Sequence, residues 1–303
     1  MLVLNKFRRL SSYFVSSPYF KIMQHLFKSY LKFIWNSTNA HGVHSPFVFD
    51  LVRNCFYDKT NYPEYSVLED YRNSLLQNKN EIEVTDFGAG SRVFKSNTRV
   101  INQIAKNAGI SPQRAKLLFR IVNYFQPKSI LEIGTSLGLA TSALALNDIA
   151  AITTLEGCPN TMAIAKNQLQ LQLPRFSNKI NFINTEFSKQ LTSYNLQPIT
   201  YNLIYFDGNH SKEATLEYFE LLLPTITNET VWIFDDIHWS TAMEEAWEII
   251  KKHPKVTVTV DTFQWGFVFF RNEQVKEDFI VRTDKSFFLD NVLGIKNLWG
   301  LLH

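Results

Sequence analysis

The stretch from Ser129 to Thr141, which reads SILEIGTSLGLAT, constrains the fold of this chain more than any other. Its apolar first part, residues 129–133, predicts a short buried strand, and a glycine-containing turn then leads into a helix rich in alanine and leucine. Gly134 permits a tight exit from the strand, and Gly138 lets the backbone approach a ligand closely. The first N–H groups of the helix are free to bind that ligand. The stretch therefore predicts a cradle for a nucleotide cofactor.

Glu156 supports the nucleotide interpretation. It ends the next strand-like run, residues 151–156, and an acid about twenty residues beyond the glycine turn is where such folds bind the ribose hydroxyls. A Gly-x-x-x-Gly spacing alone is weak evidence, so the prediction depends on this downstream acid.

Strand-like and helical runs alternate over the second half of the chain. Strands are predicted at 129–133, 151–156, 179–184, 202–207 and 230–235, and helices at 111–125, 140–146, 160–171, 211–223 and 241–252. This alternation predicts an α/β fold with a doubly wound, mostly parallel, Rossmann-like sheet that helices cover on both faces. Two further β-rich runs, 255–262 and 264–271, predict an antiparallel C-terminal hairpin and bring the sheet to seven strands.

The chain divides into an N-terminal helical extension (1–109), the α/β domain (110–285) and a C-terminal tail (286–303). No Asp or Glu precedes Asp50, whereas six Lys and Arg residues do. Residues 20–35 form an amphipathic helical pattern with one basic face. Two interpretations stay open: peripheral contact with an anionic membrane, or a helix that covers the domain or the second subunit of a homodimer. We favour the second.

Composition limits the remaining classes. The 303 residues are 45% hydrophobic and 19% charged and include two cysteines, Cys55 and Cys158, which predicts a globular, cytoplasmic protein without a disulfide framework. No apolar run approaches the roughly eighteen residues of a membrane span, and the first ten residues do not resemble a signal peptide. The basic residues stay local, so no nucleic-acid partner is predicted.

Two smaller motifs leave their roles open. His41 and His44 lie three residues apart in a Gly/Pro context, and we favour ordinary loop hydrogen bonds over ligand contacts for them. A second glycine-rich stretch, Asp86–Gly90, lacks an acid-terminated strand at the right distance behind it. It predicts a loop near the mouth of the cofactor site rather than a second cradle.

Acidic residues follow the fourth and fifth predicted strands. Asp207 opens the sequence Asp-Gly-Asn-His210, and Asp235 and Asp236 precede Ile-His-Trp. Open parallel sheets bind ligands beyond the carboxyl ends of their strands, so these residues are expected on one rim. Three facing carboxylates favour a hard cation, Mg2+ before Ca2+ or Mn2+. The alternative is that Asp207 contacts the cofactor while Asp236 caps the next helix.

These motifs resemble the class I S-adenosylmethionine-dependent methyltransferases and, within them, the catechol and caffeoyl-CoA O-methyltransferase branch. The resemblance covers residues 110–271 and rests on four segments, Ile110–Pro112, Leu131–Gly138, Phe206–Asp207 and Asp235–Asp236. A related bacterial family carries Asp-Gly-x-His at the fourth strand. The resemblance implies S-adenosylmethionine as cofactor and O-methylation of a hydroxylated small molecule, with assistance by a divalent metal such as Mg2+ as one option.

The resemblance also implies roles for individual residues. The implied cofactor-binding residues are Glu132, Gly134, Thr135, Gly138, Glu156, Gly157, Glu186, Phe187 and Asp207. In this assignment Glu132 and the two glycines line the methionine end, Glu156 holds the ribose, and Glu186 and Phe187 border the adenine. Asp207, Asp235 and Asp236 form the implied metal site, although the branch usually has Asn in place of Asp236. Asp207 and His210 are the catalytic pair, because His210 stands where the catechol enzyme has its general base, a lysine.

Other interpretations remain beside this one. A non-catalytic cofactor-binding or regulatory protein is the main alternative. It would agree with a His210 that has no catalytic role and only forms a hydrogen bond at a helix start. A nicotinamide dehydrogenase is disfavoured because the Gly-x-Gly-x-x-Gly spacing is missing. His238 and Trp239 are predicted to line the substrate site, and Trp265 to lie in the core.

Overall fold

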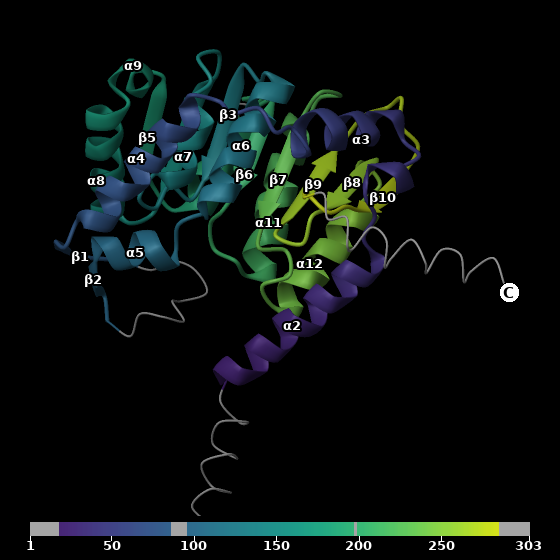
Figure 1. The fold of residues 1–303 in the computed structure, drawn as a ribbon, viewed down its shortest axis with the longest axis horizontal. Coiled ribbons are helices and arrows are strands. Elements are labelled where there is room, and N and C mark those ends of the chain that lie inside the picture. The colour runs from purple at the N-terminus through teal and green to yellow at the C-terminus, as the bar shows by residue number, and fades with distance from the viewer. Residues whose placement is uncertain (1–17, 86–95, 197–198, 285–303) are drawn as a thin grey trace, which may run out of the picture.

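A twisted eight-stranded sheet lies between two layers of helices (Figure 1). The structure is a computed structural model and describes residues 18–85, 96–196 and 199–284. The eight strands follow the order β10–β8–β9–β7–β6–β3–β4–β5. Their bounds are β3 (Ser129–Ile133), β4 (Ala151–Glu156), β5 (Ile180–Asn184), β6 (Leu203–Phe206), β7 (Val231–Asp235), β8 (Val258–Asp261), β9 (Trp265–Phe269) and β10 (Glu277–Ile280). All neighbouring pairs are parallel except those of β9, which runs antiparallel to β7 and β8.

The alternation of side chains along each strand creates two hydrophobic cores. In β6, Leu203 and Tyr205 belong to one core, whereas Ile204 and Phe206 belong to the other, because successive side chains point to opposite faces. The first core includes α4 (Glu64–Gln77), α6 (Pro112–Phe125), α7 (Leu139–Ala145) and α8 (Pro159–Gln172). The second includes α10 (Phe187–Leu196), α11 (Lys212–Leu222) and α12 (Thr241–Lys252). The predicted doubly wound α/β fold is therefore confirmed.

The sheet has one strand more than predicted. β10 pairs in parallel with β8 and forms the edge of the sheet. Its first two residues, Glu277 and Asp278, are exposed acids, so the segment lacks the apolar alternation by which a strand is recognised. The predicted antiparallel hairpin is present, but β9 inserts between β7 and β8 instead of closing the edge.

The N-terminal region is helical, as predicted. Its helices are α2 (Pro18–Asn36), α3 (Pro46–Leu51) and α4, with short helical turns at Ala40–Gly42 and Val52–Phe56. A small antiparallel pair of strands follows, β1 (Glu81–Glu83) and β2 (Thr98–Val100), and β2 leads into α5 (Ile101–Asn107). A further short helix, α9 (Pro174–Ser177), precedes β5. Leu51 and Leu75 are fully buried in the same core as the sheet residue Ile130. The division at residues 109 and 285 stays a prediction.

α2 is attached to the edge of the sheet at its C-terminal end. Thr38 forms an isolated parallel bridge with Val281 just beyond β10, and the buried Arg282 guanidinium donates to the carbonyl and hydroxyl oxygens of Ser37 at 2.9 and 3.0 Å. From this attachment α2 runs along α12 and projects from the body of the molecule (Figure 1). Among the described residues, no helix is both long and apolar enough to cross a membrane.

Some predicted features cannot be placed. The Asp86–Gly90 loop and the tail from 286 onward lie outside the described residues. His41 and His44 are exposed, and Asn39 accepts a hydrogen bond from the backbone of His41 as the cap of a short turn.

Candidate cofactor and active site

The turn between β3 and α7 requires glycine at two positions. Gly134 has a φ of 104°, and a Cβ there would lie 2.4 Å from the carbonyl oxygen of Asp207. Gly138 has a φ of 77°, and its Cβ would lie 2.6 Å from the hydroxyl of Tyr71, which itself donates to the carbonyl of Leu137 at 2.8 Å. Side chains would strain the backbone and fill the space at both positions. The tight exit from β3 at Gly134 is therefore present, whereas Gly138 packs against Tyr71, and its close approach to a ligand stays a prediction.

Glu156 ends β4 beside this turn. Its two carboxylate oxygens accept the backbone N–H groups of Ser136 at 2.7 Å and Cys158 at 2.9 Å. Burial raises the pKa of Glu156, and these backbone hydrogen bonds oppose that rise. A carboxylate oxygen has two lone pairs, so each oxygen keeps acceptor capacity for a ligand hydroxyl. The backbone therefore fixes Glu156 in an orientation suited to a vicinal diol.

Glu132 is a fully buried carboxyl group under the turn. Its Oε2 accepts from the hydroxyls of Thr141 at 2.6 Å and Thr154 at 2.5 Å, and Thr154 also contacts the hydroxyl of Thr135 at 2.5 Å. Burial raises the pKa of Glu132 to about 8. Its Oε1 has no hydrogen-bond partner among the described residues. A buried polar atom without a partner is costly, so this atom fits a polar group supplied by a ligand.

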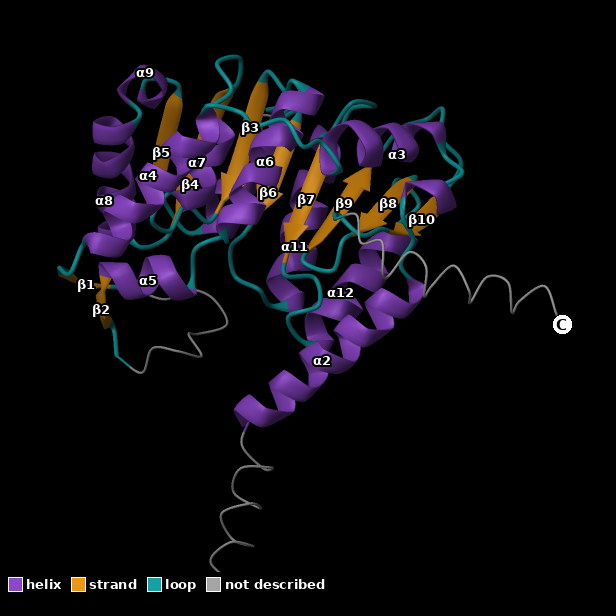
Figure 2. Ribbon diagram, viewed as in Figure 1, coloured by secondary structure: helices purple, strands orange, loops and turns teal. Residues whose placement is uncertain are grey.

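Asp207 and His210 follow β6 at the same rim. In Figure 2 the arrowheads of β3, β6 and β7 point toward the edge at which α5 lies. The Nε2 atom of His210 lies 3.6 Å from Oδ1 of Asp207. Burial and the neighbouring Asp235 carboxylate raise the pKa of Asp207 well above its usual range, and Arg114 opposes them. A cationic ligand group beside Asp207 would relieve this repulsion.

Arg114 at the start of α6 is the site residue that the sequence analysis missed. Its guanidinium forms an ion pair with the buried carboxylate of Asp235 and lies 5.1 Å from the ring centroid of Trp265. Trp265 is 1% exposed, which agrees with the prediction that it lies in the core. Asp235 also accepts from the hydroxyl of Tyr205 at 3.2 Å and from the backbone N–H of Asp236 at 2.8 Å.

The residues present do not fit the predicted metal site. The structure brings Asp207 and Asp235 together, but Arg114 already neutralises Asp235 and other donors use both of its oxygens. Asp236 continues the turn with a φ of 53° and donates its N–H to the carbonyl of Gln264. Within the described ranges, no three His, Cys, Asp or Glu side chains form a group that could hold a metal ion.

The predicted adenine side is more open. Gly157 continues from β4, and the side-chain amide of Asn184 donates to its carbonyl at 3.1 Å. Glu186 is exposed, and the half-buried Phe187 starts α10 and packs against Tyr218 with ring centroids 6.0 Å apart. These residues follow β4 and β5, on the same rim as Glu156.

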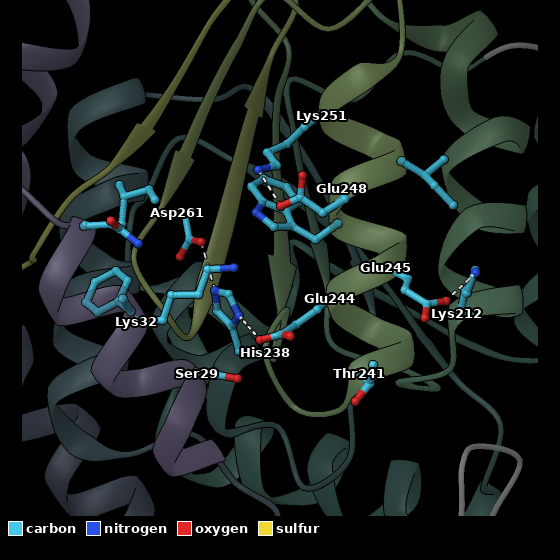
Figure 3. A pocket seen from close by; sticks show the side chains of 15 residues that line it. Ser29, Lys32, Lys212, His238, Thr241, Glu244, Glu245, Glu248, Lys251 and Asp261 are labelled. Atoms are coloured by element: carbon cyan, nitrogen blue, oxygen red, sulfur yellow. Dashed lines mark hydrogen bonds and ion pairs between the residues drawn. The ribbon is translucent and has the colours of Figure 1, made fainter. Parts of the chain in front are cut away.

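A cavity of about 480 Å3 lies beside the rim, between α2 and α12 (Figure 3). His238 lines it, and its Nδ1 and Nε2 atoms lie 2.7 Å from Glu244 and 2.9 Å from Asp261. Burial alone would lower the pKa of His238, but the hydrogen bonds and charges of Asp261 and Glu244 raise it above its usual value. With a carboxylate on each nitrogen, the protonated form of the ring can donate from both. Phe263 stacks on it with centroids 5.1 Å apart.

Comparison with known proteins agrees with this geometry. A family model described as a methyltransferase domain matches residues 131–237. This part of the chain is therefore similar to a methyltransferase domain. The matched range contains the glycine turn, Glu132, Glu156, Asp207 and Asp235. The comparison with curated proteins found no match to this sequence.

Several solved methyltransferases are similar to this chain to different extents. The SAH-bound methyltransferase PaMTH1 of Podospora anserina has a TM-score of 0.54 at 13% identity, over 76% of this chain and 97% of that one. The SAH complex of an O-methyltransferase from Bacillus cereus has a TM-score of 0.48 at 18% identity, over 69% and 90%. TomG from Streptomyces achromogenes, in complex with SAM, has 0.47 at 15%, over 55% and 83%. The similarity to PaMTH1 confirms the Rossmann-like fold.

The cradle fits S-adenosylmethionine, the cofactor of class I methyltransferases. Both glycines of the turn pack closely against protein atoms, which keeps the turn tight beside Glu156, and Glu156 offers two acceptors for a ribose diol. The unpartnered Oε1 of Glu132 favours a polar ligand group, and the burial of Asp207 beside Asp235 favours a positive charge on the ligand. The ammonium group of this cofactor supplies hydrogen-bond donors, and its ammonium and sulfonium groups supply positive charge. The chain thus carries an S-adenosylmethionine-dependent methyltransferase domain.

Proposed function

We propose that the protein transfers a methyl group from S-adenosylmethionine to a hydroxyl oxygen of a small organic acceptor. The observation that carries this proposal is the position of His210, 3.6 Å from Asp207, at the rim next to the cofactor cradle. When bound, S-adenosylmethionine supplies the methyl group from its sulfonium. Glu156 holds the ribose, Glu132 and Asp207 face the methionine end, and Glu186 and Phe187 border the adenine.

His210 acts as the general base in this proposal. The acceptor hydroxyl loses its proton to the imidazole while its oxygen forms a bond to the methyl carbon and the carbon–sulfur bond breaks. The products are a methyl ether, S-adenosylhomocysteine and a proton held by His210. Asp207 orients the ring and stabilises the imidazolium that forms. An unprotonated imidazole nitrogen can accept the proton that a hydroxyl group loses.

The cavity between α2 and α12 supports an acceptor site next to this base. Two of its lining residues, Lys212 and His238, are only two positions beyond His210 and Asp236. Its volume falls within the range of roughly 300–1,000 Å3 that small-molecule sites occupy. Phe33 and Trp247 contribute apolar wall, and Lys32 contributes a cation. An acceptor with an apolar body and a polar end fits these walls.

The resemblance also allows assistance by a divalent metal, and the residues of this rim support that option least. We propose instead that the Arg114 guanidinium supplies the fixed positive charge at this rim. It forms an ion pair with Asp235 and also interacts electrostatically with Asp207 and Asp236. No step of the proposed reaction passes through a metal.

A transfer assay tests the proposal. The purified chain is incubated with S-adenosylmethionine that carries an isotopic label in its methyl group, together with phenols, catechols and aliphatic alcohols as separate acceptor sets. We expect label in a methyl ether for at least one set, and calorimetric binding of S-adenosylhomocysteine. Tight binding with no transfer to any acceptor would favour the non-catalytic alternative, and absence of binding would refute the cofactor assignment itself.

A further inference from the structure

The side of α2 that faces away from the domain is apolar and exposed. Of the ten large hydrophobic side chains that are exposed in the described part of the chain, five belong to this one helix. They are Met23, Phe27, Tyr30, Leu31 and Trp35. Met23, Phe27 and Leu31 are spaced by four residues, so they form one row along the helix. We call Met23, Phe27, Leu31 and Trp35 the outer row.

The opposite side of α2 is fixed to the protein, which determines where the outer row points. Ser29 and Phe33 are buried, and Phe33 packs on Phe263 with centroids 5.5 Å apart. His25 lies 3.9 Å from Glu244 of α12. The bridge of Thr38 to Val281 holds the end of the helix. The outer row therefore cannot turn inward without breaking these contacts.

The charge of α2 indicates which kind of partner covers the outer row. The helix contains Lys21, Lys28 and Lys32 and no acid, and no Asp or Glu precedes residue 50 in the sequence. A second copy that paired through the same surface would bring these like charges together. An anionic lipid surface offers both apolar volume and opposite charge. A basic amphipathic helix of this kind lies in the interfacial plane rather than across the bilayer, which agrees with its composition.

We propose that α2 docks the protein on anionic membranes, with the outer row inserted at the boundary between headgroups and acyl chains and with Lys28 among the headgroup phosphates. The proposal is independent of the reaction that the methyltransferase domain catalyses. It makes the N-terminal helix a peripheral membrane anchor whose orientation the rest of the fold determines.

Vesicle sedimentation with the full chain tests this anchor. We expect sedimentation with vesicles of phosphatidylcholine and phosphatidylglycerol, little with phosphatidylcholine alone, and a decrease as salt is added. The double variant Phe27→Ser/Leu31→Ser should lose at least tenfold in vesicle affinity. The matched control Leu171→Ser/Val275→Ser, which changes two exposed apolar side chains elsewhere, should bind as the wild type does. Circular dichroism confirms that each variant is folded.

A charge variant and a solution measurement complete the test. Lys28→Glu should weaken binding to anionic vesicles, whereas Lys166→Glu on the exposed surface of α8 should not. Equal binding of the wild type and the Phe27→Ser/Leu31→Ser variant would overturn the proposal. So would a wild-type dimer in sedimentation equilibrium that this variant converts to monomer without any vesicle binding, because the outer row would then belong to a second copy.

Discussion

The guanidinium of Arg114 and the carboxylate of Asp235 form a buried ion pair although 121 residues separate them in the sequence. The pair ties the start of α6 to the end of β7 at the rim of the sheet. Because only 3% of the Asp235 side chain is exposed, its charge depends on Arg114 for neutralisation. This one ion pair therefore contributes both to the stability of the fold and to the electrostatics of the site.

Removal of the guanidinium should destabilise the protein strongly. Arg114→Met leaves the buried carboxylate of Asp235 without its cation, which costs about 3–5 kcal/mol for a buried pair. The double variant Arg114→Met/Asp235→Asn should recover much of this loss, since no buried charge remains. Urea denaturation measures both. Lys116→Met, on the same helix as Arg114, breaks an exposed ion pair with Glu69 of α4. It is the control and should have a small effect.

Chelation should leave methyl transfer unchanged. The positive charge at the rim comes from Arg114 in our proposal, so EDTA should not lower the initial rate, and added Mg2+ should not raise it. An enzyme of known metal dependence, treated in parallel, verifies that the chelator is effective. If activity disappears with EDTA and returns with Mg2+ or Mn2+, then Asp207, Asp235 and Asp236 do form the predicted metal site and Arg114 must move away from it.

Glu156→Gln should weaken cofactor binding. The substitution keeps the shape of the side chain but removes charge-assisted hydrogen bonds to the ribose, which are worth about 1.5–3 kcal/mol. This corresponds to roughly ten- to a hundredfold in affinity. Calorimetry with S-adenosylhomocysteine measures the change, and Glu213→Gln, at an exposed position in the first turn of α11, is the control. Unchanged affinity of Glu156→Gln would disprove the ribose assignment.

His210→Ala should reduce transfer without reducing cofactor affinity. A general base contributes about 10^2–10^4-fold to the rate, so kcat should fall within that range while the dissociation constant for S-adenosylhomocysteine stays within twofold. Stopped assays under saturating cofactor separate the two quantities. A rate that survives the substitution would show that His210 only hydrogen-bonds at the start of α11.

The His238 cluster should make stability depend on pH. Because the folded state raises the pKa of His238, its contribution is complete below the ordinary value of about 6.5 and is lost as pH rises through the raised value. The wild type should therefore exceed His238→Gln in unfolding free energy by more at pH 6 than at pH 9. Glu244, Asp261 and His25 are the charged groups around the ring and its partners. The exposed His41→Gln variant should show no such difference, and a pH-independent gap for His238→Gln would contradict the raised pKa of His238.

The part of the site that the sequence predicts well is local. The strand–turn–helix unit from Ser129 to Thr141 and the acid at Glu156 lie within about thirty residues of each other, so their pattern can be recognised in the local sequence. Local rules of backbone strain and helix starts determine them. The helix that begins at Pro112, with Ser111 as its cap, is confirmed for the same reason.

The part that the sequence misses depends on contacts between distant segments. Nothing near Arg114 distinguishes it from an exposed helical arginine, and only the fold brings it to Asp235. The sequence singles out His238 for the substrate site but does not predict its partner Asp261, which reaches it from β8 over a separation of 23 residues. β10 escapes notice because an edge strand with two exposed acids lacks an apolar face.

α2 has consequences for where the protein would find its acceptor. Ser29, Lys32 and Phe33 of this helix line the cavity beside His238, while the outer row covers its opposite side. A helix with its side chains is only about 10–12 Å across, so a docked protein holds the cavity within one helix diameter of lipid. The acceptor concentration that governs turnover is then the concentration dissolved at the bilayer surface, where molecules arrive by lateral diffusion. Sparingly water-soluble alcohols and phenols would reach such an enzyme without first crossing bulk water.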